Sequence, residues 1–370
     1  MLHGNTMFAV SAAIDVAIAG AYVLWAVRFR PRLPLLAGGL ALVCALLLGK
    51  LAVMVAAGLG RPFGVAHVLY LDLVVVVPTA ALLLALLRWR DGGWLVRALA
   101  VAGLLLAPIG AYASFVEPQR LVVERTEVPL SSARAGEQAV TVAVLADLQF
   151  EHLGEHERRA VDRALELRPD VILLAGDYQQ GSRASFEREL PGLRRLMSRL
   201  HAPGGVYAVQ GDQEPSIEDT RRIFAGTGVR LLVNETVTTS VADRRLTIAG
   251  LELNYRTPAA ARTIARLQDA PGADDLRILL AHRPDPVLRL APDSRVDLLV
   301  AGHTHGGQIQ LPLYGAFRTA SSLPREVCGG GLHALDGRRI YVSRGIGVER
   351  GEAPKLRFNA PPEISLLELR

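Results

Sequence analysis

The chain has 370 residues, long enough for two domains, and a formal net charge of +5. Residues 1–116 carry eight basic and three acidic side chains, so the whole positive excess lies there and residues 117–370 are neutral overall. Because no basic stripe with interleaved aromatic residues is present, nucleic acid is excluded as an expected partner.

Four apolar segments in the first 116 residues are each long enough to cross a bilayer, which needs about 20 residues. They cover residues 7–27, 35–58, 65–87 and 94–116. Four such segments in succession leave almost no polar face, so the sequence predicts a transmembrane domain of about four helices over residues 1–116. The first segment has no basic start and three more follow it, which disfavours a cleaved signal peptide.

Arginines mark the expected cytoplasmic side of this domain, because loops on that side are enriched in basic residues. They follow the first segment and flank the link between the third and the fourth: Arg28, Arg30, Arg32, Arg88, Arg90 and Arg97. Placing these links in the cytoplasm leaves both ends of the domain outside. The sequence therefore predicts a multi-pass membrane protein whose polar domain is extracytoplasmic.

Three charged residues interrupt the apolar segments, namely Asp15, Lys50 and Asp72. In the expected orientation each lies roughly eight residues inside the outer end of its helix, at a common depth of about 12 Å. Charges at that depth are costly unless they are paired. We expect Lys50 to pair with one or both aspartates, either as a structural ion pair or as a docking point for a lipid head group.

After Val116 the chain becomes polar, and strands alternate with helices. Residues 117–138 are expected to form a linker with a strand at 119–130, and 139–370 a domain. Within that domain we expect strands at 140–146, 171–175, 206–210, 277–281 and 297–301. We expect helices at 155–167, 184–200, 216–226 and 258–268. Two further β segments, at 230–240 and 245–252, are expected to turn near Asp243. From Gln308 onward we expect strands and loops. This alternation predicts an α/β layered fold with buried sheets flanked by helices.

Each buried strand of the polar domain is followed by a residue that can bind a metal. The candidates, in chain order, are Asp147-Leu148-Gln149, Gly176-Asp177, Gly211-Asp212-Gln213-Glu214, His282 and Gly302-His303-Thr304-His305. Ligands of layered α/β folds collect at the carboxyl ends of strands, so these loops can converge on one site. Mixed oxygen and nitrogen ligands favour Mn, Fe, Zn or Co, and a pair of such ions can activate water and neutralise phosphoryl charge.

The motif order resembles that of the calcineurin-like metallophosphoesterase superfamily, in particular its membrane-associated bacterial branch. The resemblance covers residues from about 119 to 370. It rests on the strand-end motifs, on Gly306-Gly307-Gln308, and on the runs Tyr341-Val342-Ser343-Arg344-Gly345-Ile346-Gly347 and Arg357-Phe358-Asn359-Ala360-Pro361-Pro362-Glu363.

This resemblance implies a two-sheet sandwich flanked by helices, two divalent metal ions, and a location in the bacterial inner membrane. By motif, one metal is held by Asp147, Gln149 and His305, and the other by Asp212, His282 and His303, with Asp177 bridging them. In this scheme a metal-activated hydroxide attacks the phosphorus in line.

Three positions differ from the family pattern. Gln149 stands where a histidine is usual, Asp212 where an asparagine is usual, and Gln213 where a histidine protonates the leaving group. An amide has no usable proton near neutral pH, and general acid catalysis is worth roughly 10²–10⁴-fold. Either the leaving group is good, as in a pyrophosphate, or His152 or His156 substitutes, or the domain binds metal without turnover.

These observations favour a membrane-bound, metal-dependent phosphoesterase. The short linker after Val116 favours a lipid-linked phosphoester or pyrophosphate as the substrate and membrane lipid as a partner. The alternative is a non-catalytic membrane sensor or scaffold derived from a phosphoesterase. A transporter is disfavoured because the helices are few and lack broken-helix pairs.

Overall fold

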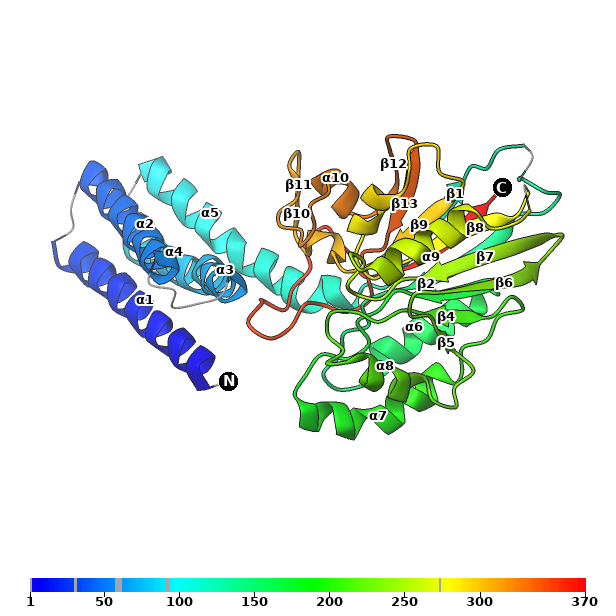
Figure 1. Cartoon of the computed structure of the whole chain (residues 1–370). Coiled ribbons are helices and arrows are strands. Elements are labelled where there is room, and N and C mark those ends of the chain that lie inside the picture. Colours follow the sequence, from blue (N-terminus) through cyan, green and yellow to red (C-terminus); the bar gives the residue numbers. More distant parts are fainter. Residues whose placement is uncertain (1, 30–31, 57–61, 91–92, 133, 273) are drawn as a thin grey trace. The chain divides into compact units, whose positions relative to one another are not determined.

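The computed structural model describes residues 2–29, 32–56, 62–90, 93–132, 134–272 and 274–370. The chain forms two compact units, which are coloured along the sequence in Figure 1. The helical unit comprises Met1–Val116 and Arg350–Lys355, and the α/β unit comprises Glu117–Glu349 and Leu356–Arg370. Within the helical unit the Nδ1 atom of His67 lies 3.1 Å from the carbonyl oxygen of Glu352.

Helices occupy all four of the predicted apolar segments. They are α1 (Leu2–Phe29), α2 (Leu33–Ala56), α3 (Pro62–Leu71) continuing through η1 (Asp72–Val76) into α4 (Val77–Arg88), and α5 (Gly93–Ala111) continuing through η2 (Tyr112–Val116) and η3 (Glu117–Gln119). Among the described residues, two helices are long and apolar enough to cross a membrane, Phe63–Leu86 and Gly93–Gln119. Ser11–Ala26 and Leu42–Ala56 are shorter apolar helices.

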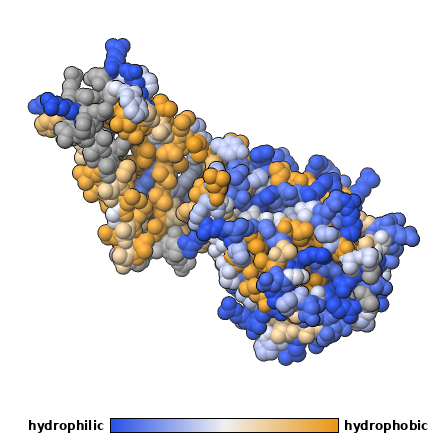
Figure 2. Space-filling view, turned by 90° about the horizontal axis from the view of Figure 1, so that it is seen from above, coloured by the Kyte–Doolittle hydropathy of each residue, from blue (hydrophilic) through white to orange (hydrophobic). Residues whose placement is uncertain are grey.

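The helical unit exposes its apolar side chains. Of the 27 large hydrophobic residues that are exposed in the described parts of the chain, 22 lie in this unit. Figure 2 shows the resulting apolar surface, which contrasts with the mostly hydrophilic surface of the α/β unit. A protein surface in water rarely carries contiguous apolar area of this extent, so the surface is typical of one that contacts lipid or another protein.

The three charged residues that were expected to pair, Asp15, Lys50 and Asp72, form one cluster, as the sequence predicted. The Lys50 Nζ atom lies 2.5 Å from Asp15 Oδ1 and 3.1 Å from Asp72 Oδ2. It also donates a hydrogen bond of 3.0 Å to the hydroxyl of Ser11. Lys50 therefore pairs with both aspartates, and its three ammonium protons are matched by three side-chain acceptors.

The α/β unit contains two six-stranded mixed sheets, which confirms the predicted α/β layers. The first has the order β1 (Val122–Val128), β14 (Glu363–Leu369), β2 (Val140–Leu145), β3 (Val171–Leu174), β4 (Val206–Ala208) and β5 (Arg230–Leu231). The second has the order β12 (Gly331–Leu335), β13 (Arg338–Val342), β9 (Leu298–Ala301), β8 (Leu276–Leu280), β7 (Arg244–Gly250) and β6 (Glu235–Val241). A two-stranded hairpin pairs β10 (Gln310–Leu311) with β11 (Gly315–Ala316).

The two sheets pack face to face. Alternate residues of each strand point to opposite faces of its sheet, so a single strand contributes to two cores. Val142 and Val144 of β2 share one core with Ile278 of β8, whereas Ala143 and Leu145 face a second core. The second core is closed by α6 (Glu155–Glu166), α7 (Arg183–Met197) and α8 (Ile217–Phe224), and a third by α9 (Pro258–Gln268) on the other sheet. Short helices η4 (Asp285–Arg289), η5 (His305–Gly307) and α10 (Arg325–Cys328) complete the unit.

One predicted strand proved to be two. The segment 230–240 divides into β5, which pairs with β4 in the first sheet, and β6, which pairs with β7 in the second. Asn234 lies between them with φ +54°, a left-handed conformation that interrupts a strand. The predicted turn near Asp243 is confirmed, since β6 and β7 form an antiparallel hairpin around it.

Candidate metal centre

The candidate ligands lie at the carboxyl ends of parallel strands in both sheets. Asp147 and Asp177 follow β2 and β3, which are parallel neighbours in the first sheet. His282 and His303 follow β8 and β9, which are parallel neighbours in the second. Together with Asp212, which follows β4, these side chains form two groups of potential metal ligands, Asp212–His282–His303 and Asp147–Asp177–His282.

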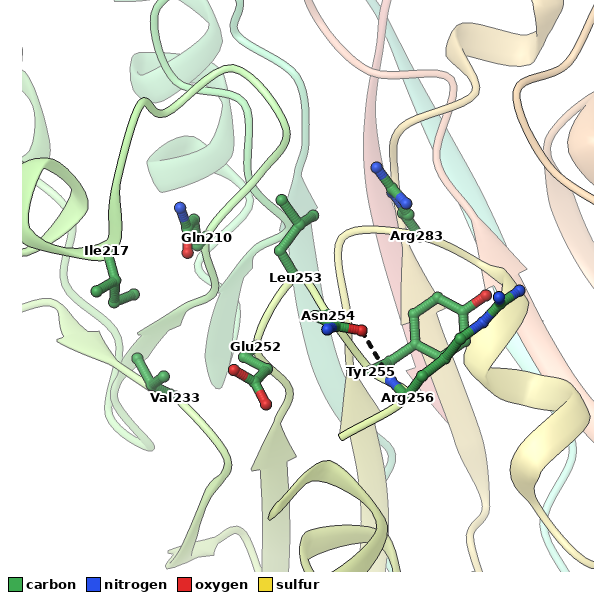
Figure 3. A pocket seen from close by; sticks show the side chains of 9 residues that line it. All are labelled: Gln210, Ile217, Val233, Glu252, Leu253, Asn254, Tyr255, Arg256 and Arg283. Carbon is green, nitrogen blue, oxygen red and sulfur yellow. Dashed lines mark hydrogen bonds between the residues drawn. The ribbon is translucent and has the colours of Figure 1, made fainter. Parts of the chain in front are cut away.

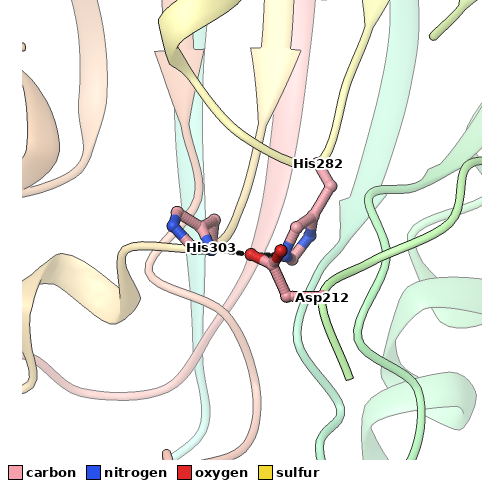
Figure 4. A group of neighbouring side chains, drawn as sticks. All are labelled: Asp212, His282 and His303. Atoms are coloured by element: carbon pink, nitrogen blue, oxygen red, sulfur yellow. Dashed lines mark ion pairs between the residues drawn. The ribbon is translucent and has the colours of Figure 1, made fainter. Parts of the chain in front are cut away.

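The first group is drawn in Figure 4, with Asp212 between two imidazoles. Its Oδ2 atom lies 2.8 Å from His303 Nδ1 and 3.4 Å from His282 Nε2. The opposite nitrogen of each ring faces a backbone carbonyl: His282 Nδ1 lies 2.7 Å from that of Ala175, and His303 Nε2 lies 3.1 Å from that of Ala320. A carbonyl only accepts, so these contacts favour the tautomers that leave the nitrogens near Asp212 with lone pairs for a metal.

The second group places two fully buried carboxylates beside His282. Its Nε2 atom lies 3.4 Å from Asp177 Oδ1, and its Nδ1 atom lies 3.9 Å from Asp147 Oδ1. Burial raises the pKa of Asp147 to about 6, and it raises the pKa of Asp177 well above its ordinary value. Buried carboxylates that lie this close together are costly unless a cation neutralises them, so the arrangement fits a bound metal.

The electrostatic field at His282 also favours a cation. Burial alone would lower its pKa, but Asp177, Asp212 and Asp147 raise the pKa of His282 to about 10. Three carboxylates thus create a strongly negative potential at this imidazole. Divalent ions with mixed oxygen and nitrogen ligands, such as Mn, Fe, Zn or Co, match that potential and this donor set.

Gln149 and His305 belong to neither group, although both are buried. The Gln149 amide nitrogen donates to Gln180 Oε1 at 3.2 Å and to Glu349 Oε2 at 3.0 Å, so the side-chain oxygen is the atom suited to a metal. Burial, with the neighbouring charge of Arg357, lowers the pKa of His305 well below its ordinary value. A neutral imidazole is the ligand form, and the His305 Nε2 atom is buried with no hydrogen bond among the described residues.

Five of the seven predicted ligands have left-handed backbone conformations. The φ angles of Asp147, Gln149, Asp177, His303 and His305 lie between +43° and +72°. Such conformations cost of order 1–3 kcal/mol for residues other than glycine, and they persist where the surrounding structure enforces them. Their concentration at the strand ends shows that the surrounding structure holds these loops in strained conformations at the candidate site.

Glycines beside the ligands are required by close packing. A Cβ atom on Gly211 would lie 2.1 Å from both the amide nitrogen and the Oδ1 atom of Asp177. A Cβ atom on Gly176, whose φ is +90°, would lie 2.7 Å from the Nδ1 atom of His282. The loops after β3 and β4 therefore approach each other so closely that only glycine fits between them.

Gly211→Ala should displace Asp177 and thereby weaken both stability and metal binding. The forced overlap should cost about 1–3 kcal/mol of unfolding free energy. Thermal unfolding and metal content per chain measure the two effects. Gly192→Ala is the matched control, because its added methyl would meet only flexible side-chain ends, Leu153 at 3.1 Å and Arg195 at 3.9 Å. Equal behaviour of the two variants would contradict the packing argument.

Glu214 has a positioning role that the sequence analysis did not assign, although it lies in the third candidate motif. Its buried carboxylate accepts hydrogen bonds from the backbone N–H groups of Asp177 at 3.2 Å, Tyr178 at 2.8 Å and Gly211 at 2.8 Å. It therefore joins the loop after β3 to the loop after β4. Its position next to Gln213 in the third motif was the available signal.

Arg283 is a second residue that sequence reasoning missed. Its guanidinium binds both carboxylate oxygens of Asp212, with 3.2 Å between Nε and Oδ2 and a shorter contact from Nη2 to Oδ1. Burial alone would raise the pKa of Asp212, but His282, His303 and Arg283 hold it well below its ordinary value. Arg283 thus offsets the extra negative charge of an aspartate at position 212. Its place directly after His282 was the available signal.

Of the residues considered for proton donation, only Gln213 has a hydrogen bond to a member of the two ligand groups among the described residues. The backbone N–H of Gln213 donates to Asp177 Oδ1 at 2.8 Å. The exposed His152 contacts Glu189 Oε1 at 3.2 Å, and His156 contacts the carbonyl oxygen of Ile346 at 3.0 Å. Neither histidine belongs to a ligand group among the described residues.

Comparison with known proteins finds similarity to phosphoesterases. The family profile described as calcineurin-like phosphoesterase matches residues 140–307. The chain is 31% identical to the uncharacterized metallophosphoesterase YkuE of Bacillus subtilis, over 73% of this chain and 93% of that protein. It is 30% identical to the phosphodiesterase YaeI of Escherichia coli, over 57% and 74% of the two chains. It is 25% identical to the UDP-2,3-diacylglucosamine pyrophosphatase LpxG of Chlamydia trachomatis, over 71% and 94%.

Proposed function

Because this chain belongs to the calcineurin-like phosphoesterase family and is a phosphoric ester hydrolase, we propose that it uses two divalent metal ions to cleave a lipid-linked phosphoester or pyrophosphate. The observation that carries the proposal is the pair of ligand groups that share His282. Two sets of oxygen and nitrogen ligands that meet at one side chain suit two adjacent cations.

We propose that Asp147, Gln149 and His305 hold one ion, that Asp212, His282 and His303 hold the other, and that Asp177 bridges them. The tautomers favoured by the carbonyls of Ala175 and Ala320 support the second set. The neutral, buried His305 supports the first. When bound, such ions activate water and neutralise charge on the phosphoryl group.

The protein's own groups have distinct parts in this scheme. Asp147 and Asp177 supply buried negative charge, and Glu214 fixes the loops that carry Asp177 and Asp212. Arg283 adds positive charge beside Asp212, in a position to stabilise negative charge that develops on the substrate. Gln213 offers no titratable proton, so the chemistry favours a leaving group that departs as an anion.

The helical unit supports a membrane location. It exposes large apolar side chains, and Phe63–Leu86 and Gly93–Gln119 have the length and composition of membrane spans. We propose a multi-pass protein of the bacterial inner membrane, with its α/β unit extracytoplasmic according to the arginine-rich links. A lipid-linked substrate is supported by the few residues between Val116 and β1, and by the similarity to a lipid pyrophosphatase.

The proposed metal dependence has a direct test. Protein purified in detergent and stripped with a chelator should lose hydrolysis of bis(p-nitrophenyl) phosphate, and added Mn²⁺ should restore it. Elemental analysis should find two metal ions per chain in the active protein. Full metal content without turnover on a panel of phosphomonoesters, phosphodiesters and pyrophosphates would instead favour the non-catalytic sensor.

A further inference from the structure

A pocket of about 640 Å³ has Arg283 among its lining residues (Figure 3). Its wall combines loops that follow β4, β5, β7 and β8 with the start of α8. The lining residues are Gln210, Ile217, Val233, Glu252, Leu253, Asn254, Tyr255, Arg256 and Arg283. Because Arg283 also binds Asp212, one side chain contacts both the pocket and the candidate metal centre.

Arg283 retains hydrogen-bonding capacity toward this pocket. A guanidinium has five N–H donors in a planar fork, and the Nε and Nη2 groups of Arg283 each bind Asp212. Its side chain is 41% exposed, and no further hydrogen bond of this guanidinium is found in the described part of the chain. The remaining donors are therefore available to an anionic ligand that lies next to Asp212.

Arg256 gives the pocket a second cation. Its guanidinium lies 5.7 Å from the centre of the Tyr255 ring, and within the described ranges it has no ion pair. The one acid of the wall, Glu252, is held by neutral donors, namely the amide of Asn234 at 2.7 Å and the hydroxyl of Thr257. Neither Arg256 nor Arg283 forms an ion pair with Glu252 among the described residues, so the acid of the wall does not neutralise them.

Gln213 restricts which leaving groups such a site can release. An alkoxide leaving group needs a proton, and Gln213 cannot give one. A phosphate monoester leaves readily as an anion, because its second pKa is only about 6. Planar guanidinium groups bind such phosphates through paired hydrogen bonds.

We propose that this pocket binds the phosphate of the leaving group, so that the bond cleaved is the P–O–P bond of a diphosphate diester. The inference rests on the proposed phosphoesterase function and specifies its substrate class. Water adds to one phosphorus as its bond to the bridging oxygen breaks. The bridging oxygen keeps the electron pair and departs on the second phosphate, and the two protons of water pass to solvent.

The rest of the pocket fits a polar group on that leaving phosphate. A volume of about 640 Å³ exceeds what a phosphate alone requires and is typical of sites for small organic ligands. Asn254 and Gln210 offer amide groups, and Ile217, Val233 and Leu253 offer apolar contact. A glycosyl or nucleoside ring has this combination of hydroxyl or amide edges and an apolar face.

Binding of the nonhydrolysable diphosphate α,β-methylene-UDP to the full-length, metal-loaded protein tests the proposal. Arg256→Ala should weaken this binding by about tenfold or more, which corresponds to loss of roughly one charge-assisted hydrogen bond. Arg283→Gln should weaken it as well. Arg262→Ala, on the exposed face of α9, is the matched control and should leave the dissociation constant unchanged. Thermal unfolding of each variant checks the fold.

Kinetics separate this inference from the general function. For Arg256→Ala, the kcat/KM for UDP-glucose should fall at least tenfold more than the kcat/KM for bis(p-nitrophenyl) phosphate, whose leaving group carries no phosphate. Equal losses on both substrates, or unchanged binding of the analogue, would overturn the pocket assignment. Wild-type protein that cleaves bis(p-nitrophenyl) phosphate but no diphosphate would overturn it too. Wild-type protein that cleaves neither would overturn the proposed function itself.

Discussion

Asp177→Asn should abolish hydrolysis while leaving the fold intact. Asp177 is buried, lies 3.4 Å from His282, and is the proposed bridge between the two ions. Asparagine keeps the shape, and its carbonyl oxygen can still accept the N–H of Gln213, so the change removes mainly one negative charge. We expect kcat to fall by at least the roughly 10²–10³-fold that loss of one buried electrostatic contact at a reacting centre costs.

Metal content and stability distinguish this effect from misfolding. The variant should bind fewer than two ions per chain by elemental analysis. Burial raises the pKa of Asp177 well above its ordinary value, so an ionised Asp177 is costly when no metal is bound. The metal-free variant should accordingly be at least as stable as metal-free wild type. Asp336→Asn, at the exposed turn between β12 and β13, serves as the control. Two bound ions and wild-type turnover in Asp177→Asn would refute the bridging role.

Lys50→Met should destabilise the helical unit by about 3–5 kcal/mol, the usual cost of removing one partner from a buried ion pair. Lys50 is the cation of a cluster in which Asp15 and Asp72 are each about 3% exposed. Methionine would leave both carboxylates buried without a counter-charge. The apparent unfolding temperature in detergent measures the loss.

A triple variant isolates the charge effect. Asp15→Asn combined with Lys50→Met and Asp72→Asn removes all three charges and should recover much of the lost stability. Hydrolysis by the triple variant decides between the two roles expected for the cluster. Full activity would support a structural ion pair, whereas loss of activity in a stable protein would support a lipid head-group site. Failure of the triple variant to recover stability would contradict the ion-pair account.

Much of the architecture followed from local patterns in the sequence. The expected helix at 258–268 coincides with α9, and the strand expected at 171–175 covers β3. Strands buried on both faces read as continuous apolar runs, and such runs are visible without tertiary information. The separation of β5 from β6 was not visible, because it depends on which sheet each strand joins.

The site was predicted in type but not in detail. Strand-end motifs identified Asp147, Asp177, Asp212, His282 and His303, which the structure brings into two groups. Gln149 and His305 lie outside those groups, and their assignment as ligands remains a prediction. The positioning role of Glu214, the contact of Arg283 with Asp212 and the pocket that Arg283 lines were not foreseen, because they depend on contacts between loops far apart in the chain.

The apolar composition of the first 116 residues, the succession of strands and helices, and the residue types at the strand ends can all be read from the sequence. These features depend on apolar periodicity and on local backbone preferences, both of which are encoded in short stretches of chain. Three features became visible only in the folded protein: which nitrogen of each imidazole faces the carboxylates, that Arg283 offsets Asp212, and that Lys50 pairs with both aspartates. Those facts depend on side-chain directions and on packing between distant segments, which sequence spacing does not specify.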